Sequence, residues 1–236
     1  MKQQPQTSQL KQSLSQKKQP VALKLKGNPT SLKHKVIVGV DEAGRGAWAG
    51  PVVAAAVQWP NRTQDQDIND SKQLTPMQRE QLFLVVEEKA EAIGIGIASC
   101  SEVDQWGVGQ ATRIAMQRAV DNLGTTVDLV MVDGYKVTFE GVESVGVIKG
   151  DSKYLSIAAA SIIAKVTRDR MLVNLHNQYP RYGFAIHKGY GTKLHQERLD
   201  KYGISREHRR SFAPVKKLLE EGKILQDELV ESSNQS

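Results

Sequence analysis

Four acidic residues stand where this sequence could do chemistry: Asp41, the adjacent Glu42, Asp133 and Asp151. Each lies beside a glycine turn or at the end of an apolar run. Carboxylates that converge cannot all stay ionised unless a cation lies between them. Hard oxygen ligands without histidine or cysteine favour Mg²⁺ or Mn²⁺ over softer metals. The set suits a two-metal site, where two ions about 3.5–4 Å apart activate a water and stabilise the leaving oxygen of a phosphodiester.

Two short apolar runs are expected to form the strands that carry these acids. Residues 36–40 precede Asp41 and residues 127–132 precede Asp133, and both runs are typical of buried strands. Sites in open α/β sheets collect at the carboxyl ends of strands, so neighbouring strands would bring the carboxylates together. Gly44-Arg45-Gly46 then forms a turn whose backbone can approach a ligand closely. Alternatively, this stretch is a plain hairpin with two acids in its loop.

Helical segments should separate these strands. Thr75 fits an N-cap, Pro76 the first helical position and Gln78 a capping box. Residues 157–164 are small and apolar nearly all round, which is typical of a helix buried at close range. In chain order the expected elements are a helix at 76–92, a strand at 93–99, a helix near 110–122, a strand at 144–148, a helix at 154–176, and a glycine-rich loop at 183–194 that enters another helix.

Composition limits the partners and the location. A net charge of +6 and a pI near 9.3 suit a polyanionic partner. The single cysteine, Cys100, allows no intrachain disulfide and fits a reducing, cytoplasmic location. No apolar run approaches the roughly 20 residues that span a bilayer, so no membrane association is expected. Residues 1–34 are basic and polar and predict a flexible arm, and residues 218–236 predict a polar tail.

Seven short motifs, in order, resemble those of ribonuclease HII, the bacterial type 2 ribonuclease H. They are Asp41-Glu-Ala-Gly-Arg-Gly46, Asn69-Asp-Ser-Lys72, Val132-Asp-Gly134, Lys149-Gly-Asp-Ser-Lys153, Ala158-Ala-Ala-Ser-Ile-Ile-Ala-Lys165, Lys188-Gly-Tyr-Gly-Thr-Lys193 and His208-Arg-Arg-Ser-Phe212. Each alone is weak, but all seven in this order are highly specific. The resemblance spans residues 35–217.

The resemblance implies an α/β fold of the ribonuclease H type over residues 35–217, with a mixed sheet flanked by helices and a helical carboxyl-terminal region. It also implies a monomeric endonuclease that cuts the RNA strand of RNA–DNA hybrids. The same enzyme would cut on the 5′ side of a single ribonucleotide embedded in duplex DNA. Two-metal-ion hydrolysis would leave 3′-hydroxyl and 5′-phosphate ends.

The family's functional residues map onto this chain one by one. Its metal-binding, catalytic acids fall on Asp41, Glu42, Asp133 and Asp151. The substrate-binding positions are Gly44, Arg45 and Gly46 for the ribose 2′-hydroxyl, Tyr190 for the ribonucleotide–DNA junction, and Ser71, Lys72 and Lys165 for phosphates. The type 3 relatives lack the arginine of the glycine loop and carry an extra amino-terminal domain, so Arg45 and the short arm favour type 2.

Some residues depart from the pattern or invite over-interpretation. Ala47-Trp48 stands where the family often has Pro-Leu, which could soften or re-aim the loop, and Gly107-Val-Gly109 should delay the start of the following helix. Asp169 is expected in an ion pair or on a solvated face beside Arg168 and Arg170. His187 and His195 lack metal-ligand spacing and are expected at the surface. Cys100 should be a small buried apolar residue, and the three tryptophans should serve packing.

Two other functions remain open from the sequence. A second nuclease of the same fold, such as a junction resolvase, would share the carboxylates but not the glycine–arginine loop followed by Gly-Tyr-Gly. A non-catalytic nucleic-acid binder would have little reason to aim carboxylates at phosphates. Cleavage of duplex DNA that bears one ribonucleotide, with and without Mg²⁺, separates the three.

Overall fold

A computed structural model of the chain describes residues 36–60 and 74–223. Its strands are β1 (Ile37–Ala43), β2 (Val52–Gln58), β3 (Ala92–Ala98), β4 (Leu129–Asp133) and β5 (Glu143–Val147). Its helices are α2 (Pro76–Lys89), α3 (Cys100–Asp121), α4 (Leu155–Gln178), α5 (Phe184–His187), α6 (Lys193–Tyr202) and α7 (Ala213–Glu220), with 3₁₀ turns η3 (Gly150–Ser152) and η4 (Pro180–Tyr182). The predicted arm, Ser71 and Lys72 lie outside the described residues.

The five strands form one mixed sheet in the order β3-β2-β1-β4-β5. β1 is antiparallel to β2 and parallel to β4, so the expected neighbouring strands are present. Asp41 and Glu42 lie within β1 and not in the loop of a hairpin, so the alternative of a plain hairpin with two acids in its loop was wrong. The register pairs Val40 with Val132. The next residues along these two parallel strands are Asp41 and Asp133, so the topology itself brings the two carboxylates to the same edge of the sheet.

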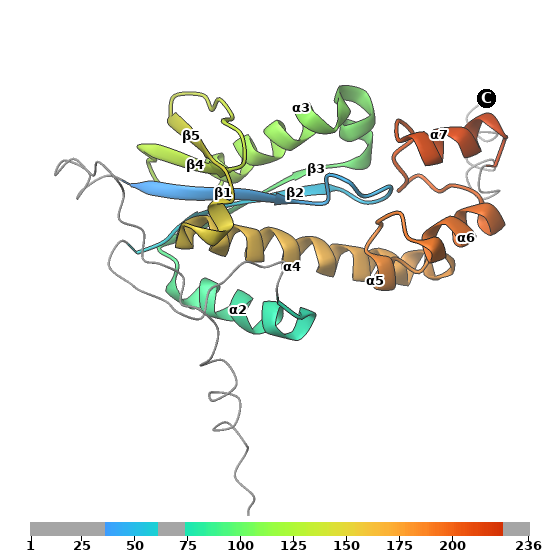
Figure 1. Cartoon of the computed structure of the whole chain (residues 1–236), viewed down its shortest axis with the longest axis horizontal. Helices are drawn as coiled ribbons and strands as arrows, with labels where there is room; N and C mark the ends of the chain where they lie inside the picture. The colour runs from blue at the N-terminus through green and yellow to red at the C-terminus, as the bar shows by residue number, and fades with distance from the viewer. Residues whose placement is uncertain (1–35, 61–73, 224–236) are drawn as a thin grey trace, which may run out of the picture.

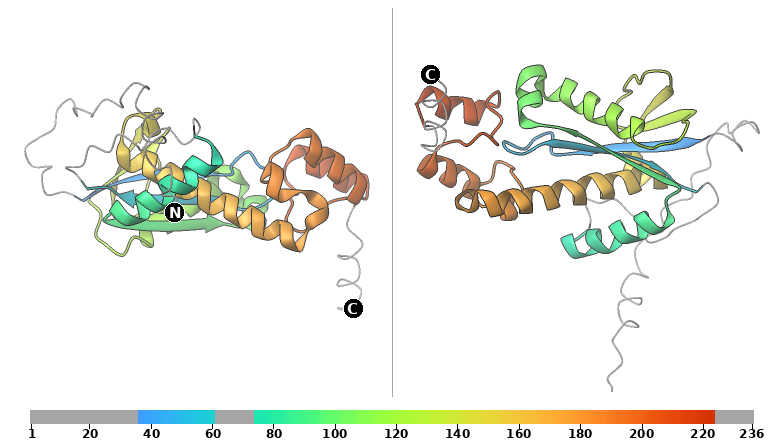
Figure 2. Two further views of the ribbon diagram at one scale, coloured as in Figure 1. Left: turned by 90° about the horizontal axis from the view of Figure 1, so that it is seen from below. Right: turned by 180° about the vertical axis from the view of Figure 1, so that it is seen from behind.

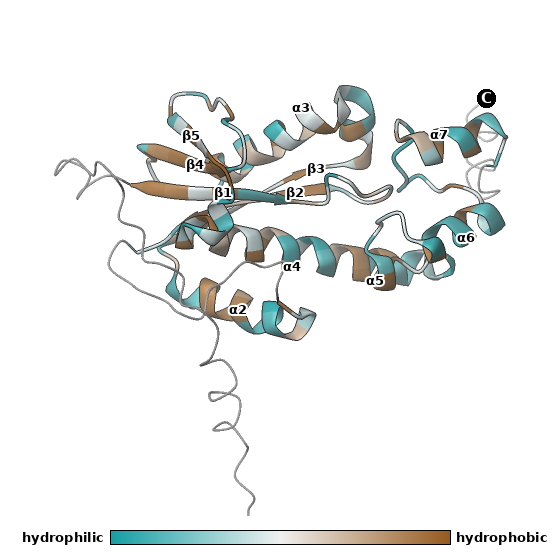
Figure 3. Cartoon of the chain, viewed as in Figure 1, coloured by the Kyte–Doolittle hydropathy of each residue, from teal (hydrophilic) through white to brown (hydrophobic). Residues whose placement is uncertain are grey.

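Helices cover both faces of the sheet (Figures 1 and 2). α3 packs on one face, and α4 packs on the other with α2 outside it. The small residues of α4 allow close approach: a Cβ on Gly39 of β1 would lie 2.3 Å from the backbone nitrogen of Ile157. The prediction of a helix buried at close range is therefore confirmed. In Figure 3, β1 changes from hydrophobic to hydrophilic toward its carboxyl end, where the chemistry-bearing residues lie.

The carboxyl-terminal helices gather at the far end of α4, beyond the edge of the sheet (Figure 2). A separate apolar cluster holds them there; it includes Leu172 of α4, Phe184 of α5, Leu199 of α6 and Leu218 of α7. Leu218 is buried, and the proposed tail boundary at residue 217 falls inside α7. None of the helices in the described part of the chain is long and apolar enough to cross a membrane.

The local predictions hold for α2 and fail for α3. Thr75 caps α2 and forms the expected capping box with Gln78. α3, expected near residue 110, begins at Cys100 because Ser99 and Glu102 form a second capping box. Gly107 does interrupt this helix, with a φ of 75°, but as a kink inside it and not as a delayed start. The mixed sheet, its flanking helices and the helical carboxyl-terminal region agree with the predicted fold class.

Candidate active site

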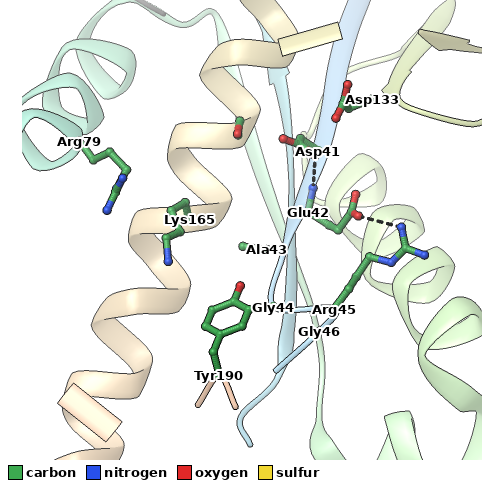
Figure 4. A pocket seen from close by; sticks show the side chains of 11 residues that line it. Asp41, Glu42, Ala43, Gly44, Arg45, Gly46, Arg79, Asp133, Lys165 and Tyr190 are labelled. Carbon is green, nitrogen blue, oxygen red and sulfur yellow. Dashed lines mark hydrogen bonds and ion pairs between the residues drawn. The ribbon is translucent and has the colours of Figure 1, made fainter. Parts of the chain in front are cut away.

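A cavity of about 330 Å³ opens at the carboxyl end of β1. Its lining comes from segments far apart in the sequence: Asp41, Glu42, Ala43, Gly44, Arg45, Gly46, Arg79, Asp133, Ser161, Lys165 and Tyr190. Figure 4 shows carboxylates at one end of the cavity, the glycine turn and Tyr190 at the other, and the side chains of Lys165 and Arg79 facing it from the helices. The cavity thus joins acids, cations and an approachable backbone.

The environment at this edge of the sheet disfavours ionisation of Asp41 and Glu42. Burial, together with the nearby charges of Glu42 and Asp133, raises the pKa of Asp41 to about 8. The backbone N–H of Glu42 donates to Asp41 Oδ1 at 2.7 Å and partly opposes this shift. Burial also raises the pKa of Glu42, although Arg45 counteracts it through an ion pair of 3.2 Å. The site therefore concentrates negative charge that its own residues only partly neutralise.

The donor atoms of this edge fit a hard divalent cation, because all are carboxylate oxygens. Within residues 36–60 and 74–223, however, no three acidic, histidine or cysteine side chains form a ready set of metal ligands. Glu42 Oε1 is held by Arg45, and Asp133 Oδ1 accepts a 2.7 Å hydrogen bond from the backbone N–H of Gly150. Among the described residues, Arg45 engages only one of the two carboxylate oxygens of Glu42, so the other oxygen can still bind a cation.

The fourth acid lies next to the cavity but does not line it. Asp151 is 6% exposed in η3, directly after the residue whose backbone donates to Asp133. Lys149, which precedes the turn, has a φ of 56°, a left-handed conformation uncommon outside glycine. The structure therefore gathers Asp41, Glu42 and Asp133 in the cavity, whereas Asp151 follows the residue that bonds to Asp133 and is not part of the lining. The role of all four as metal ligands remains a prediction.

The two glycines of the Gly44-Arg45-Gly46 turn differ in what the protein demands of them. Gly44 has a φ of 95°, and a Cβ there would lie 2.0 Å from Nε of Arg168. A Cβ on Gly46 would meet no protein atom within 4 Å. Packing therefore requires glycine at position 44 but not at position 46, where the open space faces the cavity.

Tyr190 reaches the cavity from the loop between α5 and α6. Its backbone pairs with Ala47 across an isolated bridge, which joins this loop to the glycine turn. Lys165 Nζ lies 5.6 Å and Arg168 Cζ 5.2 Å from the ring centroid, within range of cation–π attraction. The predicted proximity of Tyr190, the glycine turn and Lys165 is thus seen in the structure. The Trp48 ring lies 5.5 Å from the His195 ring at a tilt of 34° and packs against Gly191, so this tryptophan supports the loop.

Two histidines expected at the surface are buried, so that prediction was wrong. His187 and His195 stack with ring centroids 4.1 Å apart. His187 Nε2 bonds to the carbonyl of Tyr182 and its Nδ1 accepts the N–H of Gly189, while His195 bonds to the carbonyl of Tyr190 and to His208. These rings position the Tyr190 loop from inside.

The remaining residues near the cavity include some positions that the sequence predicted and some that it did not. Asp169 pairs with Lys165 at 2.7 Å, and not with its flanking arginines. Ser161 and Arg79 line the cavity, which the sequence did not predict. Ser161 carries the hydroxyl group in an otherwise apolar run of α4, and Arg79 lies in the first turns of α2. A polar residue within an apolar helix was the available signal for Ser161. Cys100 is buried as expected, and burial raises its thiol pKa to about 11.

Comparison with known proteins places the chain in one family. The family model for ribonuclease HII matches residues 38–215. Ribonuclease HII of Geobacillus thermodenitrificans is 51% identical over 183 residues, which cover 78% of this chain and 70% of that protein. Ribonuclease HII of Bacillus cereus is 44% identical over 210 residues, which cover 88% of this chain and 81% of that one.

Solved structures agree with this placement. Ribonuclease H2 of Pyrococcus horikoshii superposes with a TM-score of 0.68 at 28% identity, over 78% of this chain and 97% of that one. RNase HII of Archaeoglobus fulgidus, solved in a complex with PCNA, gives a TM-score of 0.63 at 26% identity, over 75% and 95%. Bst-RNase HIII, at 18% identity and a TM-score of 0.61, shares the fold. The chain therefore belongs to the ribonuclease HII family and is a hydrolase of the ribonuclease H type.

Proposed function

We propose that this chain cuts the RNA strand of RNA–DNA hybrids and also cuts on the 5′ side of a single ribonucleotide embedded in duplex DNA. The observation that supports the proposal is the composition of the one cavity beside β1. It holds Asp41, Glu42 and Asp133 at one end and the glycine turn with Tyr190 at the other. A phosphate and the adjacent sugar can therefore be examined by different ends of the same site.

Divalent cations, Mg²⁺ or Mn²⁺, are proposed as cofactors. Asp41, Glu42, Asp133 and Asp151 would hold them, because a cation would stabilise the ionised form of Asp41, whose pKa is raised by burial and by the charges of Glu42 and Asp133. Bound cations would supply Lewis acidity for the attacking water and for the leaving 3′-oxygen. Products with 3′-hydroxyl and 5′-phosphate ends are expected. The Mn²⁺ complex of Bst-RNase HIII is consistent with this proposal.

The remaining cavity residues suit recognition of nucleic acid. Lys165 and Arg79 face the cavity from α4 and α2, where cationic side chains can contact phosphates. The space at Gly46 lets a ribose come close to the backbone, whose groups can hydrogen-bond the 2′-hydroxyl that distinguishes RNA from DNA. The ring of Tyr190 can pack against a neighbouring sugar. The chain would then select the ribonucleotide through backbone and ring contacts, and not through base identity.

One cleavage experiment tests this function. Labelled duplex DNA with a single ribonucleotide is incubated with the protein, with Mg²⁺ or with excess chelator, beside an all-DNA duplex of the same sequence. We expect one cut on the 5′ side of the ribonucleotide, only with the metal, and none in the all-DNA duplex. Cleavage of the all-DNA duplex or of a four-way junction would instead support the resolvase function, and binding without cleavage would support a simple binder.

A further inference from the structure

A buried arginine joins the two loops that line the cavity. Arg168 of α4 is fully buried, and its guanidinium donates to three backbone carbonyls. Nε bonds to Pro51 at 2.9 Å, Nη2 to Ala49 at 3.0 Å and Nη1 to Lys188 at 2.9 Å. The first two carbonyls belong to residues 44–51, termed the glycine loop, and the third belongs to residues 187–192, termed the tyrosine loop. One planar group therefore bonds to both loops.

A second buried arginine holds the glycine loop alone. Arg209 is also fully buried. Its Nε and Nη2 donate to the carbonyl of Gly50 at 3.0 and 2.8 Å, and its Nη1 donates to the carbonyl of Arg45 at 2.9 Å. It makes no side-chain hydrogen bond to the tyrosine loop among the described residues. The chain thus offers a natural control for Arg168, with similar burial and the same kind of partners.

A contribution to stability alone does not explain why these two buried residues are arginines. Burying a cation is costly, and burial lowers the pKa of both guanidinium groups, that of Arg209 to about 10. Neither forms an ion pair with a carboxylate within residues 36–60 and 74–223. Well-packed apolar residues often stabilise a protein as well as buried charges do. What arginine adds is a rigid planar set of donors that fixes several acceptors relative to one another.

The backbone of both loops closes on Arg168 so tightly that side chains would not fit. A Cβ on Gly44 would lie 2.0 Å from its Nε, and a Cβ on Gly189 would lie 3.4 Å from its Nη2 and 2.3 Å from the carbonyl oxygen of Ala49. The N–H of Trp48 donates to the carbonyl of Gly189 at 2.8 Å, which joins the loops directly. The Tyr190 ring then lies over the same guanidinium.

We propose that Arg168 is a positioning residue that sets the glycine loop and Tyr190 in a fixed register, and that Arg209 steadies only the glycine loop. The consequence for recognition rests on the function proposed above. The contacts to the 2′-hydroxyl and to the neighbouring sugar must be made together, so a shift of one loop against the other would weaken discrimination even if every contacting residue were present.

Hydrogen exchange tests the register without any substrate. Arg168→Lys keeps the charge but removes the planar fork, so amide exchange should rise in both the glycine loop and the tyrosine loop. Arg209→Lys should raise exchange mainly in the glycine loop. Unchanged exchange in the tyrosine loop of Arg168→Lys, or equal increases in both loops for the two variants, would overturn the proposal.

A double-mutant cycle tests whether the register matters to cleavage. We expect Arg168→Lys to lower kcat/KM on duplex DNA with one ribonucleotide by about 10- to 100-fold, because displacements near 1 Å can cost this much. If Arg168 acts through Tyr190, the double variant should lose clearly less kcat/KM than the product of the fold losses of Arg168→Lys and Tyr190→Ala. The losses of Arg209→Lys and Tyr190→Ala should multiply. If the kcat/KM losses of Arg168→Lys and Tyr190→Ala also multiply, Arg168 supports only the fold.

Gly189→Ala provides the same test if Arg168→Lys does not fold. Its methyl group would press on the carbonyl of Ala49 and separate the loops while Arg168 stays in place. The double variant Gly189→Ala, Tyr190→Ala should also lose less kcat/KM than the product of the two single-variant fold losses. A loss equal to that product would contradict the proposal. If the wild-type protein cleaves no ribonucleotide-containing duplex, the proposed function fails, and the exchange comparison still decides the role of Arg168.

Discussion

Replacing Asp41 with asparagine should stabilise the metal-free protein while it abolishes cleavage. The pKa of Asp41 is raised from 3.8 to about 8 by burial and by its acidic neighbours. Between these values the folded protein holds a proton that the unfolded chain releases, so the contribution of Asp41 to stability falls as the pH rises through this window. At pH 7 the group lies about three pH units above its unfolded pKa, which corresponds to a destabilisation of up to about 4 kcal/mol.

Asparagine keeps the shape and the oxygen that accepts from the backbone of Glu42, but it carries no charge. The free energy of unfolding of Asp41→Asn in excess chelator should therefore exceed that of the wild type by up to about 4 kcal/mol at pH 7. The gain should shrink toward zero below about pH 3, where Asp41 is protonated in both the folded and the unfolded wild-type chain.

Urea denaturation at several pH values measures this difference. The matched control is Asp200→Asn, because Asp200 is an exposed carboxylate on α6. The control should change the free energy of unfolding by no more than about 0.5 kcal/mol. Added Mg²⁺ should stabilise the wild type more than the variant, because the wild type keeps the full ligand set. A variant that is less stable than the wild type at pH 7, or a gain that does not depend on pH, would refute this reasoning.

Three further predictions follow from the site. Gly46→Ala should leave the free energy of unfolding, measured by urea denaturation, within about 0.5 kcal/mol of the wild-type value yet lower kcat/KM on ribonucleotide-containing duplexes, whereas Gly44→Ala should also destabilise the fold. Tyr190→Ala should impair cleavage at a single ribonucleotide more than cleavage of a continuous hybrid; equal losses would assign Tyr190 to general binding. Burial lowers the pKa of His195 to about 4 and of His208 to about 3. At these two positions the unfolded chain thus binds more protons below about pH 6.5. Each histidine should therefore lower the free energy of unfolding by roughly 1.4 kcal/mol per pH unit as the pH falls toward 4, opposite in sign to the effect of Asp41, and His208→Gln should remove one of these two contributions from the pH profile measured by urea denaturation.

The parts of the fold that follow from local patterns could be predicted from the sequence. Apolar runs that end in acids gave the positions of β1 and β4, and the rule that sites lie at the carboxyl ends of strands predicted that Asp41 and Asp133 would meet. The start of α2 followed from its capping box. The start of α3 differs from the prediction because a second capping box, at Ser99 and Glu102, begins the helix at Cys100, and Gly107 only kinks it.

The interior supports of the site could not be predicted, because their partners are distant backbone atoms. Arg168 bonds to carbonyls 117 and 119 residues away and Arg209 to one 164 residues away. A charged residue on a helix and a histidine in a glycine-rich loop are usually exposed, and no local pattern marks carbonyl groups that will need a donor. The burial of His187 and His195 was missed for the same reason.

The central claim is that the carboxylates beside β1 perform metal-dependent cleavage at a ribonucleotide. The most direct test compares wild type and Asp133→Asn on duplex DNA with one ribonucleotide, with Mg²⁺ and with excess chelator, and maps the ends of the products. We expect a single cut on the 5′ side of the ribonucleotide, with a 3′-hydroxyl and a 5′-phosphate, for the wild type only and only when Mg²⁺ is present. Cleavage in excess chelator, or wild-type rates in a folded Asp133→Asn protein, would contradict it.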